Sequence, residues 1–544
     1  MIVRAAGTAA LLPPARGAGA EEGDGDLGSE MSRMTARRRL GLLAVTTLTV
    51  GGTLGGLVQP ASAAPASDPV LYWNDVLLET YKTVGGAPGP LARGGAMVHA
   101  AIYDAVNSIT TTGQPYVFKT EAPNASLRHA VAHAAHDALV AAFPGQDFSD
   151  ELTTALADAG SDTGDGTGLG KAAAAAIVAN RAGDGSGDTT PYPVNTAPGH
   201  WRPTGSGDAA TPNWGKVKPF TMTSGTQFRP QHPAGHSSMA SLLSSAEYAA
   251  QVNEVKSLGS AGSTTRTPEQ TQIAHFWAND LDGTYKPPGQ LFEHTRIVAV
   301  QRGLGTADKA RLFALVALAM GDAGIVAWDR KYQTDIDLWR PESAVQLADT
   351  DGNAATEADP NWRPLSKFRD GTPFSPPFPA YTSGHATFGG AWAGAMKSFF
   401  GTDDVTFTAT TDDPFAQGVT RTFTSFTAAA VENARSRVYL GVHYQFDGDH
   451  GVSSGKAMAE SAAVNFVRPS GAPTPGKVGC AFADVYKTYS NGTLKDYHVS
   501  PNRDTLVQVH FASSDGVAQY VTVDSGFLKG QKGWVGSTCV RFIA

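Results

Sequence analysis

Cysteine is scarce in this chain: of its 544 residues, only Cys480 and Cys539 carry a thiol. Two thiols alone make a poor zinc site, so a cysteine-based metal centre is not expected. Both residues lie near the C-terminus, and an isolated pair in an exported protein is typical of a disulfide. We therefore predict a Cys480–Cys539 disulfide in the C-terminal part of the chain.

Positive charge and long apolar runs are also in short supply. The formal net charge is −8, which argues against nucleic acid or an anionic membrane surface as a partner. Any basic groups that bind an anion must therefore be gathered locally. Apart from residues 40–58, we expect no segment to be apolar enough to cross a bilayer. The hydrophobic content of 41% is still sufficient for a large core.

The N-terminus has the pattern of a targeting segment. Arg37-Arg38-Arg39 precedes an uncharged apolar run of 58 − 40 + 1 = 19 residues, and Ala61-Ser62-Ala63 follows it. A run of this length could also be a membrane anchor. Its glycine and threonine content and the small-x-small end favour cleavage, and the paired arginines are typical of a twin-arginine signal. We predict that residues 1–64 are a leader and cleavable export signal, and that the mature protein is secreted without stable membrane association.

Helical periodicity dominates the chain up to residue 468. Apolar spacing and caps predict helices over 91–109, 128–143, 171–181, 245–258, 267–280, 294–304, 306–331, 389–400, 428–439 and 448–466. Further on, alternating apolar residues at 506–511 and 520–523 predict strands. The predicted fold class is mainly α. We expect a helical domain over 68–468, a linker over 469–476 and a small β-rich module over 477–544.

The most informative stretch is residues 378–388, Phe-Pro-Ala-Tyr-Thr-Ser-Gly-His-Ala-Thr-Phe. A helix that begins at Ser383-Gly384-His385 directs free backbone N–H groups and its positive dipole end at one point, which suits an oxyanion. Ser383 adds a hydroxyl, Gly384 permits close backbone approach, and His385 adds an acid/base near neutral pH. Alone, the tripeptide would more often be an N-cap serine, a turn glycine and a half-buried histidine.

Other residues in the chain, taken together with this tripeptide, favour a functional site over the ordinary structural explanation. They are Trp328 with Lys331 and Arg340, Arg437 with His443 and Asp447, and Asp280. Each polar residue alone has an ordinary structural explanation, such as a surface ion pair, a core histidine or a helix cap. Together they supply cations, two imidazoles, a hydroxyl and carboxylates. That set suits a tetrahedral or trigonal-bipyramidal oxyanion.

The spacing of Arg437, His443 and Asp447 sets a condition on where a helix in this region can end. His443 and Asp447 lie at i and i+4, which would place them on one helical face, so that the carboxylate can hold one ring nitrogen. Arg437 lies six residues before His443, about 240° away on a continuous helix. The helix must therefore end between them, and Gly441 is a reasonable stop.

The spacing of Lys331 and Arg340 sets a similar condition. Lys331 and Arg340 lie 340 − 331 = 9 residues apart, which is about 180° around a continuous helix. The chain must therefore leave the helix between them, and residues 334–337 are the candidate place. Otherwise Lys331 cannot reach the same anion as Arg340.

The motifs Lys-x(n)-Arg-Pro, Ser-Gly-His and Ser-Arg-x5-His-x3-Asp lie within residues 328–447. They resemble the signature shared by vanadium-dependent haloperoxidases and type 2 phosphatidic-acid-phosphatase-like acid phosphatases. The stretch 378–391 is similar to the fungal-type chloroperoxidase sequence, and looser similarity covers about 68–467. Two features depart from the family pattern: the Lys331–Arg340 spacing is wider, and Thr382 stands in place of the usual proline.

The resemblance implies vanadate as the cofactor and a role for each matching residue. It assigns the vanadate oxygens to Lys331, Arg340, Ser383, Gly384 and Arg437. It assigns vanadium itself to His443, and an acid/base role to His385. Trp328 and Phe378 match residues of the halide pocket. Asp447 would orient His443 as part of the catalytic set, and Asp280 would pair with the second arginine.

The activity that the resemblance implies is haloperoxidation: hydrogen peroxide oxidises halide to hypohalous acid, which attacks a small organic acceptor. The alternative is a phosphatase of the same superfamily, in which His443 attacks phosphorus and His385 protonates the leaving group. Trp328 and Phe378 favour haloperoxidase because large aromatic walls narrow the pocket and keep it dry. A third possibility, from another class, is a secreted binding protein whose C-terminal module is the active part.

Overall fold

The structure is a computed structural model that describes residues 68–205, 207–471, 474–478, 485–490, 493–499, 501, 505–512, 518–525, 528–536 and 539–542. The predicted leader and export signal lie outside the described residues, as does Cys480. The helical part and the β-rich part are each described by themselves.

The described chain up to residue 471 is mainly helical, as predicted. Its α-helices are α1 (Pro69–Val84), α2 (Pro88–Thr110), α3 (Leu127–Ala142), α4 (Ser149–Leu156), α5 (Gly166–Arg181), α6 (Met239–Leu243), α7 (Ala246–Leu258), α8 (Pro268–Phe276), α9 (Lys286–Gln301), α10 (Thr306–Tyr332), α11 (Pro341–Gln346), α12 (Gly384–Phe400), α13 (Phe426–Tyr439) and α14 (Gln445–Asn465). A hairpin of β1 (Phe407–Thr410) and β2 (Thr420–Phe423), which the sequence analysis did not predict, precedes α13.

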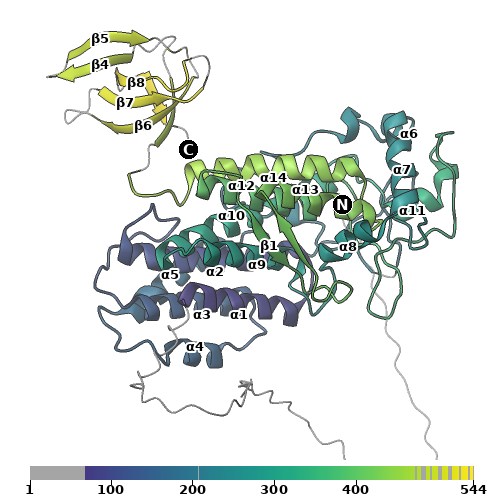
Figure 1. Cartoon of the computed structure of the whole chain (residues 1–544), viewed down its shortest axis with the longest axis horizontal. Helices are drawn as coiled ribbons and strands as arrows, with labels where there is room; N and C mark the ends of the chain where they lie inside the picture. The colour runs from purple at the N-terminus through teal and green to yellow at the C-terminus, as the bar shows by residue number, and fades with distance from the viewer. Residues whose placement is uncertain are drawn as a thin grey trace, which may run out of the picture. The chain divides into compact units, whose positions relative to one another are not determined.

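Helix α10 is the centre of the helical part. Its sequence is apolar nearly all round, and every residue from 312 to 332 is buried. It packs against α2, α12 and α14, and therefore joins the group α1–α5 to the group α12–α14 (Figure 1). By length and composition α10 could cross a membrane, which corrects our expectation that no later segment could. In this fold α10 is a core helix, and 94% of its most apolar 18-residue stretch is buried.

Helices α12 and α14 approach unusually closely because small residues face each other. A Cβ at Gly390 would collide with the carbonyl oxygen of Val452, and one at Gly455 would collide with that of Thr387. Side chains at these positions would force the helices apart. The contact brings the N-terminus of α12 next to the first turn of α14, where the backbone N–H of Ser383 donates to the carbonyl of Asp447 at 3.1 Å.

Several predicted helix boundaries were wrong, among them the end of α8 and the start of α9. Helix α8 begins as predicted after Thr267, whose hydroxyl accepts from the Gln270 amide at 3.2 Å, but it ends at Phe276 instead of residue 280. Helix α9 begins at Lys286, eight residues before the predicted start. The two prolines at 287 and 288 fall in its first turn, where proline is tolerated because its missing N–H would have no partner there.

The C-terminal part forms an antiparallel sheet from β3 (Thr474–Val478), β4 (Val485–Ser490), β5 (Thr493–Val499), β6 (Leu506–Ala512), β7 (Ala518–Val523), β8 (Lys532–Gly536) and β9 (Val540–Phe542). The strand order is β5-β4-β8-β7-β6-β3-β9. Buried valines, among them Val507 and Val521, form its core. Strand β3 begins inside the predicted linker. Cys539 is disulfide-bonded, in keeping with its predicted role, but its predicted partner Cys480 is not described.

The glycine contact between α12 and α14 predicts an unusual response to alanine. Gly455→Ala should lower the free energy of unfolding by about 1–3 kcal/mol, because the new methyl group meets the backbone of α12. Gly324→Ala in α10 is the matched control. Its Cβ would find its nearest neighbours at 3.4 Å, so it should be neutral or stabilising by up to about 1 kcal/mol. Urea denaturation of both variants checks this, and equal midpoints would contradict the close packing.

Candidate active site

The site begins where the loop of residues 378–383 enters α12. Ser383 is the N-cap residue, and its hydroxyl accepts from the Ala386 amide at 3.4 Å. Gly384 is the first helical residue, and a Cβ there would lie 3.2 Å from the ring of Trp328. The positive end of a 17-residue helix therefore faces the C-terminal end of α10. The loop-to-helix junction lies where the sequence predicted it, at Ser383-Gly384-His385.

Lys331 and Arg340 both reach this loop. The Lys331 ammonium donates to the carbonyls of Pro379 and Ala380, at 2.5 and 3.0 Å. Nε of Arg340 donates to the carbonyl of Phe378 at 2.7 Å. Helix α10 ends at Tyr332, and the chain is not helical again until α11, so the condition set by the nine-residue spacing is met.

Arg437 enters from α13 and is paired with an acid. Its Nη2 donates to Oδ2 of Asp280 at 2.6 Å, and both residues are buried or nearly so. Helix α13 ends at Tyr439, and Gly441 adopts a φ of +81°, which a residue with a side chain rarely adopts. The chain therefore turns as predicted, and His443 comes back toward the same place.

His443 and Asp447 are in contact, but not for the reason that the sequence suggested. Helix α14 begins at Gln445, so His443 precedes it and the two do not share a helical face. Asp447 lies in the first turn, where its Oδ2 accepts from Nδ1 of His443 at 2.7 Å and from the Tyr444 amide at 3.1 Å. The correction follows from capping, because a carboxylate at this position can accept from N–H groups at the helix entrance.

The hydrogen bonds of His443 define its tautomer. Nδ1–H of His443 donates a hydrogen bond to Asp447, and Nη1 of Arg340 donates to Nε2 at 3.0 Å. Nε2 must therefore carry a lone pair. Burial holds the pKa of His443 well below its usual range, and the nearby Arg340 and Lys331 lower it further. Burial also raises the pKa of Asp447 to about 7, against the opposing effect of Lys331.

His385 lies at the other side of the site, close to Asp280. Its Nε2 lies 2.9 Å from the carbonyl of Ala278 and 3.8 Å from Oδ1 of Asp280. Burial lowers the pKa of His385 to about 4, and the Arg437 charge adds to this effect while Asp280 opposes it. The structure places Asp280 between Arg437 and His385.

The aromatic residues lie beside the cations. The rings of Trp328 and Phe378 are 4.8 Å apart between centroids, and the Lys331 ammonium lies 5.0 Å from the Phe378 ring. Arg340 lies 4.6 Å from the same ring. These contacts put an apolar wall directly against the basic groups, where it excludes water and strengthens their field.

The basic groups retain buried donors without a partner. Nη2 of Arg340, and Nε and Nη1 of Arg437, make no hydrogen bond within the described residues. Buried N–H groups of this kind ordinarily have an acceptor. Of Lys331, Arg340 and Arg437, only Arg437 forms an ion pair with a carboxylate of the described residues, Asp280. A multiply charged oxyanion such as vanadate or phosphate fits, because it supplies both the missing acceptors and the missing negative charge.

The structure thus brings together every residue that the sequence selected for the site. Sequence reasoning missed the part played by backbone carbonyls, of Phe378, Pro379, Ala380, Val442 and Ala278. The sequence marked Thr382 only as a departure from the family pattern. Its hydroxyl donates to the carbonyl of Asp447 at 2.7 Å, so the threonine ties the loop to α14. Only the polarity of threonine could have suggested this.

Fold and site together define a helical enzyme with a buried oxyanion-binding centre. A family model described as the VCPO second helical-bundle domain matches residues 311–469. The vanadium chloroperoxidase of Curvularia inaequalis is 31% identical to this chain, and the match covers 70% of this chain and 78% of that protein. The chain therefore belongs to the vanadium haloperoxidase family.

Solved structures agree on the fold. A bacterial vanadium-dependent iodoperoxidase superimposes with a TM-score of 0.61 at 23% identity, covering 75% of this chain and 99% of that one. A holo-type bacterial vanadium-dependent chloroperoxidase gives a TM-score of 0.55 at 18% identity, covering 70% and 93%. At these identities the likeness supports the helical architecture alone.

The surroundings of His385 predict its titration. In the vanadate-free protein it should titrate near pH 4 by NMR, with His385→Gln used to assign its signal. Removing the neighbouring carboxylate with Asp280→Asn should lower the midpoint, whereas an added oxyanion should raise it. Because the folded pKa is lower than the unfolded value of about 6.5, this residue costs stability as the pH falls from about 6.5 through 4. A midpoint at or above 6.5 would contradict the site geometry.

Proposed function

We propose that this protein binds vanadate between Arg340, Arg437 and His443 and uses hydrogen peroxide to oxidise halide. The observation that carries this proposal is the set of buried, unpartnered guanidinium N–H groups. They lie in the same site as His443. Nε2 of His443 carries a lone pair, and its Nδ1 donates a hydrogen bond to Asp447. Vanadate, when bound, supplies a Lewis-acid centre at which peroxide becomes reactive toward halide.

The chain's own residues have separate tasks in this proposal. Arg340, Arg437 and the N-terminus of α12 would neutralise the anion's oxygens, and Ser383 would add its hydroxyl. Lys331 uses two donors on carbonyls, and in its charged form it retains a third, which would be available to donate a hydrogen bond to peroxide. His385 is largely neutral at pH 6 in the vanadate-free protein and so can take a proton from peroxide.

Trp328 and Phe378 would form the place where halide approaches. Their rings lie against Lys331 and Gly384, so a halide there would be partly desolvated next to a positive charge. Desolvation makes a halide ion a better nucleophile. Hypohalous acid or its equivalent would then react with a small organic acceptor. The names of the relatives include both a chloroperoxidase and an iodoperoxidase, so chloride, bromide and iodide all belong in the assay.

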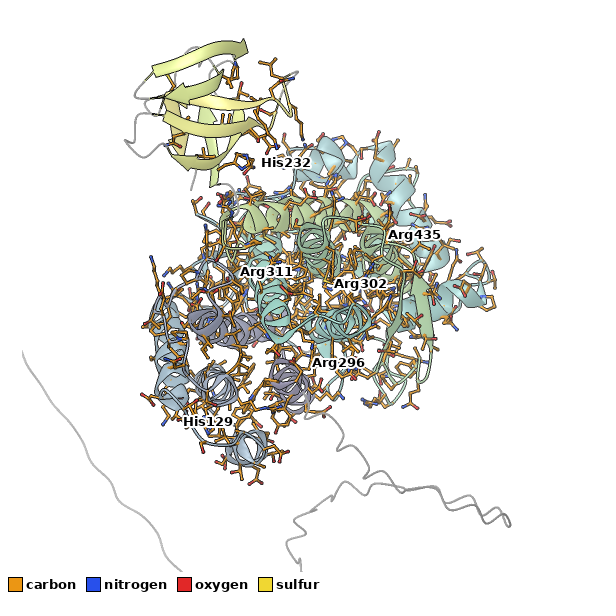
Figure 2. All side chains as sticks on the ribbon, turned by 60° about the vertical axis from the view of Figure 1, so that its left-hand side comes forward. His129, His232, Arg296, Arg302, Arg311 and Arg435 are labelled. Atoms are coloured by element: carbon orange, nitrogen blue, oxygen red, sulfur yellow. The ribbon has the colours of Figure 1, made fainter. Side chains whose placement is uncertain are left out.

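Arg437→Met tests this proposal against a matched control on the same helix. Arg437→Met should reduce vanadate-dependent halogenation of a dione by about 100-fold or more, because it removes donors to the anion. Arg435→Met removes a cation that pairs with Glu254 and Gln445 instead, and should leave the rate within about twofold. Figure 2 labels Arg435.

The phosphatase alternative is decided in the same preparation. Vanadate-free protein should cleave p-nitrophenyl phosphate slowly, and orthovanadate with peroxide should switch on halogenation. Rapid phosphate release without halogenation under any halide would overturn the haloperoxidase proposal. It would also assign Nε2 of His443 the role of nucleophile toward phosphorus.

We also propose that the protein is exported by a twin-arginine signal and secreted, on the strength of the arginine run, the apolar stretch and Ala61-Ser62-Ala63. A reporter fused after residue 68 should be exported, and replacing Arg37, Arg38 and Arg39 with lysine should abolish export. Lysine keeps the positive charge, so comparing the arginine and lysine reporters tests whether arginine itself is recognised. Unchanged export of the lysine variant would exclude this route.

A further inference from the structure

A second hollow lies near the catalytic loop but outside the site described above. Its walls come from residues 229–232 and 333–336, with Ser237 and Arg330, and its volume is about 400 Å³. We refer to it as the Arg330 pocket. It combines two sequence features that the proposed function leaves unexplained: the histidine- and proline-rich segment at 230–236 and most of residues 334–337, where the wider Lys331–Arg340 spacing falls.

Arg330 is a buried cation without an acid of its own. It is 1% exposed, and it makes no ion pair within the described part of the chain. The carboxylate next to it in sequence, Asp329, is taken by Arg229 through hydrogen bonds of 2.5 and 2.9 Å. Burying an uncompensated charge is costly, so a missing anionic partner is the simplest explanation for the arrangement.

The remaining contacts of Arg330 do not supply negative charge. Its Nη2 lies 3.1 Å from Nδ1 of His232, and its guanidinium lies 5.0 Å from the ring centre of Tyr381. Its Nε has no hydrogen-bond partner among the described residues. Burial lowers the pKa of Arg330 and the nearby Arg229 adds to this effect, while Tyr381 and Asp329 oppose it. Figure 2 shows His232 at the edge of the helical part, far from His129 on α3.

The walls of the pocket indicate what it would accept. Arg229, whose side chain is 33% exposed, is already paired with Asp329, and Asp335 is an exposed acid that opposes an anion, so Arg330 is the cation left to hold the ligand. Pro230 and Ile336 give the pocket apolar surface. The volume exceeds that of a bare inorganic ion, so a carboxylate attached to a small apolar group would use both the charge and the apolar walls.

We propose that the Arg330 pocket binds a small ligand that carries a carboxylate or an equivalent oxyanion group, held by Arg330. The site is distinct from the vanadate site, although Tyr381 belongs to the loop whose Pro379 and Ala380 carbonyls hold Lys331. The proposal does not depend on the proposed halide chemistry.

Calorimetric titration of the full-length protein tests it, with one equivalent of vanadate added so that the oxyanion centre is filled and no free oxyanion competes for the Arg330 pocket. Benzoate is the organic probe, and sulfate is the inorganic one. At least one should bind at a single site, and Arg330→Met should weaken binding at least tenfold. Ser237→Trp should do the same by filling the pocket, without changing any contact of Arg330. Arg302→Met removes an exposed cation elsewhere on the helical part and should leave binding unchanged.

Comparing the two probes shows whether the anionic group of the ligand belongs to an organic molecule or is a free inorganic ion. Binding of benzoate without sulfate supports an organic carboxylate as ligand, and binding of sulfate alone supports a free inorganic oxyanion. No binding of either probe would overturn the proposal. Binding that survives both Arg330→Met and Ser237→Trp would overturn it as well, and Ser237→Trp keeps the test decisive if Arg330→Met fails to fold.

Discussion

The structure of the site depends on the burial of three cations in one small volume. Lys331, Arg340 and Arg437 are almost completely removed from water, where each alone would be strongly unfavourable. Two carboxylates and a row of backbone carbonyls offset part of this cost, and the rest calls for an anion. The fold therefore builds a centre whose most stable partner is a multiply charged oxyanion. The same requirement explains why aromatic rings, and not acidic side chains, cover the remaining face.

Helix packing turns that requirement into a defined geometry. The buried length of α10 brings Lys331 to the loop, while the glycine-lined contact of α12 with α14 holds the helix N-terminus against Asp447. Asp447 then serves two elements at once: its side chain orients His443, and its carbonyl accepts from Thr382 and Ser383. A small change in the separation of these two helices would therefore move the loop and the histidine together.

The sequence predicted the members of the site better than the reasons for their positions. Ser383-Gly384-His385 was recognisable because a loop, a cap and a small-residue helix are local features. The break at Gly441 and the need to leave the helix after Lys331 followed from helical phase. By contrast, the relation of His443 to Asp447 was assigned to a helical face that does not exist, since the i, i+4 spacing carries no record of where α14 begins.

Other features could not be predicted because they depend on contacts between distant segments. The carbonyls that hold Lys331 and Arg340 belong to the loop of residues 378–380 and to Val442, and every residue has a carbonyl, so no side-chain pattern marks them. The β1–β2 hairpin is short, and its strands are stabilised by pairing and not by strong alternation. The early start of α9 required the two prolines to be assigned to a first turn.

We propose that Arg340, Arg437 and His443 meet on one oxyanion. A crystal structure of the protein grown with orthovanadate tests this directly. We expect a single vanadium peak next to Nε2 of His443, with oxygens within hydrogen-bond distance of both guanidinium groups and of the N-terminus of α12. Vanadate bound elsewhere, with those guanidinium groups paired to the protein instead, would contradict it.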